Sequence, residues 1–104
     1  MRWKLQLAIA IATLAASVVG AQAATINIII KGLKFTPAAV TAHVGDTIVW
    51  TNQDPMPHTA TARSKDWDLS IPPGQSASFV VAKAGTFDYF CRIHASMSGK
   101  LTVN

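Results

Sequence analysis

The sequence predicts an all-β fold, a single β-sandwich of about seven strands in a Greek-key arrangement, preceded by a cleavable signal peptide. Two observations favour it. Short runs rich in Ile, Val, Thr and aromatic residues recur along the chain, and Gly- or Pro-containing turns separate them at intervals of roughly eight to twelve residues. After the leader, no segment repeats its apolar residues with the periodicity of a helix of two turns or more.

The first 23 residues are predicted to be a signal peptide. Arg2 and Lys4 provide a positive start, residues 5–20 are mostly apolar, and Ala21-Gln22-Ala23 has the small residues that signal peptidase recognises. A retained membrane anchor is the alternative, but the apolar stretch is short for a spanning helix and polar residues interrupt it. We therefore expect cleavage after Ala23, within a residue or so, and export to a bacterial periplasm.

The remaining residues, 24–104, are expected to form one domain. Its β-prone segments are, in order, residues 25–30, 39–44, 47–51, 59–62, 67–71, 75–82, 86–91 and 99–103. The first is mostly Ile and Thr, and Gly45-Asp46 is a turn pair between the second and third. Residues 52–55 begin a loop, Pro72-Pro73-Gly74 closes the fifth segment, and Lys83-Ala84-Gly85 separates the sixth from the seventh.

Charge and cysteine content narrow the possible functions. The chain has nine Lys and Arg against five Asp and Glu, but Arg2 and Lys4 lie in the leader and the others form no cluster. Nothing in this pattern supports nucleic-acid binding. A small exported domain usually carries disulfides, yet this chain has a single cysteine, Cys91. That thiol is either an inert buried side chain or a metal ligand, and its neighbours decide between the two.

Four side chains predict a metal site. Cys91, His94 and Met97 stand three residues apart, and a further histidine, His58, lies well before them in the chain. A thiolate, two imidazoles and a thioether form a soft N₂S₂ set, and a His₂Cys site with a weak axial Met is typical of blue-copper electron-transfer centres. We therefore predict that these four residues bind one copper ion.

Strand geometry suggests how the donors meet. Side chains alternate along residues 86–91, so Cys91 points inward at the last position. The chain must turn there, and a short loop can return His94 and Met97 to the same point, while His58 arrives from another loop at the same end. With all four protein positions filled, little room remains for a substrate, so the protein is predicted to be an electron carrier and not an enzyme.

Three stretches, residues 44–50, 52–58 and 85–100, resemble the cupredoxins, the family of small blue copper proteins. Within this family the resemblance is closest to the amicyanin group, and the plastocyanin and pseudoazurin groups come next. It covers nearly all of residues 24–104. The tight Cys-x₂-His-x₂-Met loop is its most specific element.

The resemblance implies a type 1 copper site and a use for it. His58 and His94 would coordinate through Nδ1, Cys91 would give the short thiolate bond, and Met97 would be the axial ligand. The protein would carry single electrons between transient redox partners, such as an amine dehydrogenase and a cytochrome c. We expect a diffusible monomer without a nucleic-acid partner and without stable membrane insertion after signal cleavage.

Asn52 is predicted to support the site from behind the ligands. It lies six residues before His58 and matches the family's asparagine beside the ligand cysteine. The resemblance implies that it ties the two ligand loops together and donates a backbone N–H to the Cys91 sulfur. An ordinary turn asparagine after Trp50 is the alternative.

The chain departs from the amicyanin pattern at one point. That group has prolines on both sides of the loop histidine, where this chain has Ile93 and Ala95. Proline lacks an N–H, so Ile93 offers an additional donor. We expect this N–H to reach the Cys91 sulfur, stabilise Cu(I) and raise the reduction potential.

Two other functions use the same residues. A periplasmic copper-binding protein for delivery, storage or resistance would exchange its metal readily, although Met-rich or His-rich tails, which would favour it, are absent from the sequence. A thiol enzyme would use Cys91 as the nucleophile and a nearby histidine as its base, but it gives Met97 no role.

Overall fold

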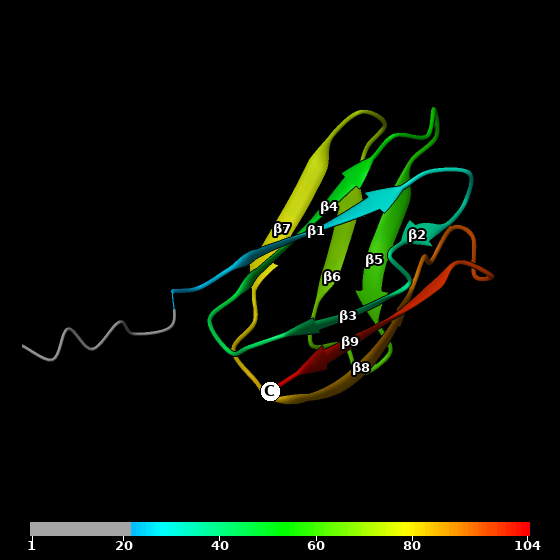
Figure 1. Ribbon diagram of the computed structural model, residues 1–104. Coiled ribbons are helices and arrows are strands. Elements are labelled where there is room, and N and C mark those ends of the chain that lie inside the picture. The colour runs from blue at the N-terminus through cyan, green and yellow to red at the C-terminus, as the bar shows by residue number, and fades with distance from the viewer. Residues whose placement is uncertain (1–21) are drawn as a thin grey trace, which may run out of the picture.

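The computed structural model describes residues 22–104, which form two β-sheets packed as a sandwich (Figure 1). The predicted signal peptide lies outside the described residues except for Gln22 and Ala23. Within the described part of the chain there is no helix, and so none that is long and apolar enough to cross a membrane. The predicted all-β class is confirmed.

The described residues form nine strands, where the sequence predicted about seven. They are β1 (Thr25–Ile30), β2 (Phe35–Thr36), β3 (Ala39–Ala42), β4 (Thr47–Asn52), β5 (His58–Ala62), β6 (Asp68–Ile71), β7 (Ser76–Val80), β8 (Gly85–Phe90) and β9 (Ser98–Val103). The two-residue β2 was missed because it is too short to show an alternating pattern. β3 ends before the predicted 44, because the N–H of His43 donates to the Asp46 carboxylate and begins a turn.

The strand order brings two distant segments together at one end. One sheet has the order β2-β1-β4-β7 and the other β3-β9-β8-β5-β6, with parallel pairing of β1 with β4 and of β3 with β9. β5 and β8 are antiparallel neighbours, with Thr61 opposite Phe90. The first residue of β5, His58, and the residue after β8, Cys91, therefore lie at the same end of this sheet.

The core is built around aromatic rings. Trp50 of β4 is fully buried, stacks on Phe79 at 5.9 Å between ring centroids, and meets Tyr89 edge to face at 5.5 Å. Tyr89 in turn lies opposite Gly99 of β9. A side chain at Gly99 would overlap the Tyr89 ring, so this position requires glycine for close packing and not for an unusual backbone angle. The core thus packs tightly against β8 and β9, the strands that precede and follow the Cys91 loop.

Candidate metal centre

The predicted thiolate and the first predicted imidazole meet inside the protein. The Cys91 sulfur lies 3.8 Å from Nδ1 of His58, and both side chains are almost completely buried. His58 reaches this place as the first residue of β5, and Cys91 reaches it one residue past the end of β8. Neither side chain contacts bulk water, so the pair can hold a metal in a dry environment.

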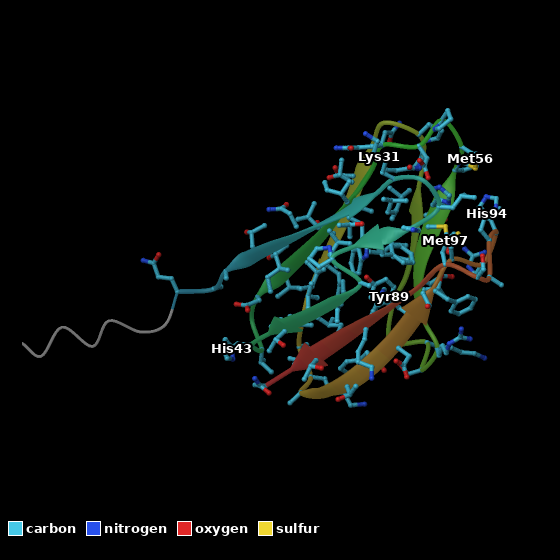
Figure 2. The ribbon with its side chains drawn as sticks, turned by 45° about the vertical axis from the view of Figure 1, so that its right-hand side comes forward. Lys31, His43, Met56, Tyr89, His94 and Met97 are labelled. Carbon is cyan, nitrogen blue, oxygen red and sulfur yellow. The ribbon has the colours of Figure 1, made fainter. Side chains whose placement is uncertain are left out.

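The loop after Cys91 folds back on itself as the spacing predicted. The N–H of Met97 donates to the His94 carbonyl at 2.9 Å, and the N–H of Cys91 donates to the Met97 carbonyl at 3.2 Å. Met97 packs into the core and is 2% exposed, while His94 stays partly exposed. The His94 ring lies beside the His58 ring, 5.1 Å away between centroids. Figure 2 shows His94 and Met97 together at one end of the sandwich, with Met56 nearby.

The donors fit copper by their chemistry. Among residues 22–104, no three His, Cys, Asp or Glu side chains converge closely enough to hold an ion by themselves. The structure instead brings the Cys91 thiolate next to the His58 imidazole. The His94 imidazole lies beside His58, and the buried thioether of Met97 belongs to the same loop as His94. Thiolate and thioether favour Cu(I), and imidazole accommodates Cu(II), so this set suits a copper ion that changes oxidation state.

The Cys91 sulfur receives its hydrogen bond from Thr59, the residue after His58. The Thr59 N–H lies 3.3 Å from the sulfur. Burial raises the pKa of the Cys91 thiol, but the N–H groups of Thr59 and His94, the His58 ring and the N–H of Ile93 outweigh burial, so the pKa lies below its ordinary value. The sequence predicted a hydrogen bond from the Ile93 N–H to the sulfur, but the backbone N–H that forms one is that of Thr59, and Ile93 contributes only the smallest of the effects that lower this pKa. The surroundings favour the thiolate that copper requires.

The predicted role of Asn52 was wrong in its main part. Its backbone N–H donates to the Gln75 carbonyl and not to the Cys91 sulfur. Its side-chain Nδ2 donates to the carbonyls of Met56 and Ile71 at 2.8 and 3.0 Å, and its Oδ1 accepts the N–H of Asp54 at 2.9 Å. Asn52 therefore organises the loop that leads into β5 and His58. The backbone N–H that the resemblance assigned to Asn52 is supplied instead by Thr59, because Thr59 directly follows His58 and lies beside the sulfur.

Asp54 supports the site and was not singled out from the sequence. Its Oδ2 lies 2.8 Å from Nε2 of His58, and a carboxylate can only accept there, so Nε2 carries the proton and Nδ1 keeps a lone pair that is free to bind a metal. The same carboxylate accepts the N–H of Gly32 at 2.7 Å and of Leu33 at 3.0 Å. An aspartate four residues before a predicted ligand histidine, in the loop that leads to it, is the signal that would have revealed it.

The carboxylate of Asp54 also holds an irregular turn. Gly32 and Leu33 both have φ of 60°, in the left-handed region, which disfavours a side chain such as Leu. The N–H of Leu33 is the main cause that lowers the pKa of Asp54 below its ordinary value; burial opposes this, and the Gly32 N–H and His58 add to the lowering. Asp54 thus connects the β1–β2 turn to His58, one of the predicted ligands.

The remaining histidine, His43, takes no part in this site. It is exposed in the turn after β3, and Figure 2 shows it at the opposite end of the sandwich from His94 and Met97.

These features define a class: a two-sheet β-sandwich that gathers soft metal donors at one end. The cupredoxin-like domain model matches residues 4–103, and the chain belongs to this family, as its sequence predicted. Plastocyanin of Scenedesmus fuscus is 36% identical over 86 residues, which cover 68% of this chain and 87% of that protein. Amicyanin of Paracoccus denitrificans is 31% identical over 80 residues, covering 71% of this chain and 61% of that protein.

Solved structures of amicyanin variants have a similar fold. The Cu(I) form of a methionine-to-alanine variant of amicyanin is similar to this chain with a TM-score of 0.67 and 29% identity, over 77% of this chain and 82% of that one. An oxidised methionine-to-leucine variant of amicyanin has a TM-score of 0.69 and 29% identity, over 76% of this chain and 81% of that one.

Proposed function

We propose that this protein is a type 1 copper protein that carries single electrons between redox partners. Its ligands are His58, Cys91, His94 and Met97, and its cofactor is one copper ion. The observation that carries the proposal is the buried contact between the Cys91 sulfur and His58 Nδ1, at 3.8 Å, with a hydrogen bond from Thr59 to the sulfur. A blue-copper centre needs this combination of thiolate and imidazole.

Each residue has a distinct task. When bound, the copper ion supplies the Cu(II)/Cu(I) couple that takes up and releases one electron. Asp54 fixes the tautomer and orientation of His58, and Thr59 stabilises the Cys91 thiolate. Backbone hydrogen bonds close the loop between Cys91 and Met97, which restrains both sulfur atoms. A protein frame that changes little between the two oxidation states lowers the reorganisation energy of each electron transfer.

We also propose that the protein works after export and is not an enzyme. The anchored fold begins at the predicted cleavage point, because the Ala24 N–H donates to Asp46 Oδ1 at 2.8 Å and the Ala24 carbonyl accepts from Thr47 at 2.9 Å. This placement supports cleavage after Ala23 and a periplasmic location. The mass of the protein recovered from the periplasm should correspond to a chain beginning at Ala24, within a residue. A retained leader would contradict export by this route.

The partners are proposed to be proteins that donate and accept single electrons, such as an amine dehydrogenase and a cytochrome c. The partly exposed ring of His94 offers an edge for such contacts. Association is expected to be weak and transient, because redox partners usually share small interfaces.

Absorption of the protein loaded in its host compartment tests the proposal. We expect an intense thiolate-to-copper band in the visible, which Cys91→Ser abolishes. Met97→Leu should keep the band and shift the reduction potential, whereas the matched variant Met56→Leu should leave both nearly unchanged. A colourless metal-loaded protein would refute the copper assignment. A blue protein whose electron self-exchange is very slow would favour copper delivery over electron transfer.

A further inference from the structure

A groove on the surface of the second sheet has no role in the site described so far. It has a volume of about 460 Å³ and lies over β5, β6 and β8. Five of its lining side chains carry the argument: Arg63, Lys65, Asp68, Phe90 and Arg92. Phe90 faces this groove because its neighbour Tyr89 points into the core.

The groove carries more positive charge than the protein neutralises. Arg92 pairs with Asp68, with Nε and Oδ1 3.0 Å apart. Among the residues that the structure describes, neither Arg63 nor Lys65 forms an ion pair. Three cations around one carboxylate repel one another, so the groove favours an anionic occupant.

One of these cations is held in place. The Arg63 guanidinium lies over the Phe90 ring, with Cζ 4.5 Å from the ring centroid. This cation–π contact orders a side chain that would otherwise move freely, which reduces the entropy lost on binding. An ordered guanidinium can bind a carboxylate through two N–H groups at once.

The groove is connected to the Cys91 thiolate through chain neighbours and two hydrogen bonds. Phe90 and Arg92 flank Cys91 in the chain. The N–H of Arg92 donates to Thr59 Oγ1 at 2.8 Å, and the N–H of Thr59 donates to the Cys91 sulfur at 3.3 Å. Thr59 therefore links Arg92, which lines the groove, to the sulfur through two hydrogen bonds.

We propose that this groove docks an acidic surface segment of the protein that exchanges electrons with the metal centre. The inference rests on the proposed electron-carrier function and specifies the chemistry of its partner. Glutamate and aspartate side chains match the groove, because their carboxylates pair with Arg63 and Lys65 and their methylene groups can lie against Phe90. Electrostatic steering of this kind speeds encounter without requiring tight binding.

A capped hexaglutamate peptide tests the groove directly, with amide NMR shifts of the reduced protein purified from the periplasm. We expect the peptide to shift the amides of Arg63, Lys65 and Phe90. Arg63→Gln and Arg92→Gln should each weaken binding by about 2- to 5-fold, as expected for single exposed charge pairs. Asp68→Asn should tighten binding, because it removes the one carboxylate in the groove.

The matched control is Lys31→Gln, which removes one positive charge from the β1–β2 turn on the other sheet. It should change peptide affinity by less than Arg63→Gln does. Equal weakening by both variants, or shifts centred on the loop around His94, would overturn the proposal. So would inorganic phosphate that shifts the same amides as strongly as the peptide, since that would indicate a site for small anions.

The readout separates this inference from the function on which it rests. Peptide binding is measured by amide shifts and needs no electron transfer, so a failed copper assignment would not change it. Conversely, absent peptide binding would leave the absorption band of the Cys91 centre untouched and would refute the docking proposal alone.

Discussion

Replacing Asp54 with Asn should destabilise the protein before any metal binds. The carboxylate is only 9% exposed and serves three donors. Its Oδ1 accepts the Gly32 N–H, and its Oδ2 accepts the Leu33 N–H and His58 Nε2. An asparagine has one acceptor oxygen, so at least one of these donors then faces an amide NH₂ group.

The expected loss in the free energy of unfolding follows from these hydrogen bonds. Hydrogen bonds to a charged acceptor contribute about 1.5–3 kcal/mol each, against about 0.5–1.5 kcal/mol for neutral ones, and a buried donor without a partner costs about 1–3 kcal/mol. Weakening two bonds and orphaning one donor gives a loss of about 3 kcal/mol. For a domain of this size, each kcal/mol lowers the melting temperature by about 4–8 °C. We therefore expect the metal-free variant to melt more than about 10 °C below the parent.

Urea and thermal unfolding of the metal-free protein measure this loss. Asp66→Asn is the matched control, because Asp66 is exposed and its weak ion pair with Lys83 spans 3.9 Å. That control should change the free energy of unfolding by less than about 0.5 kcal/mol. In the copper-loaded protein, Asp54→Asn should also raise the reduction potential, because a less polarised His58 stabilises Cu(II) less. A metal-free variant as stable as the parent would refute the assigned role of Asp54.

Three further predictions concern the core and the carboxylates. Gly99→Ala should lower the free energy of unfolding by at least about 2 kcal/mol, because its methyl group overlaps the buried Tyr89 ring; Ser98→Ala on the same strand is the urea-denaturation control. Burial raises the pKa of Tyr89 to about 12, so the absorbance of its phenolate should appear at a higher pH than the ordinary pKa of 10.0 would give. Because the unfolded chain ionises first, stability should fall above pH 10. At acid pH, the pKa of Asp46 is lowered mainly by the N–H of His43, so its contribution is present above 3.8 and lost as the pH falls below that value. Asp46→Asn should flatten this part of the acid stability profile, and an unchanged profile would count against it.

The strands that present the predicted ligands, and the turn that follows Cys91, could be predicted from the sequence, because both depend on neighbours in the chain. The three-residue spacing of Cys91, His94 and Met97 is a local property, and backbone hydrogen bonds within that loop realise it. Alternation along residues 86–91 likewise placed Tyr89 in the core. His58 was predicted as the fourth donor from donor chemistry, and the antiparallel pairing of β5 with β8 places it at the same end of the sheet as Cys91.

Only the tertiary structure decided which groups surround those donors. Thr59 and not Asn52 reaches the Cys91 sulfur, and Arg63 lies over Phe90. Asp54 joins His58 to a turn whose residues precede Asp54 by 21 and 22 positions. Each of these contacts depends on the register between strands or on how two loops approach, and a shift of one residue would replace every partner. Sequence patterns report what a residue can do with its near neighbours. Which distant group it meets is settled when the two sheets pair and pack.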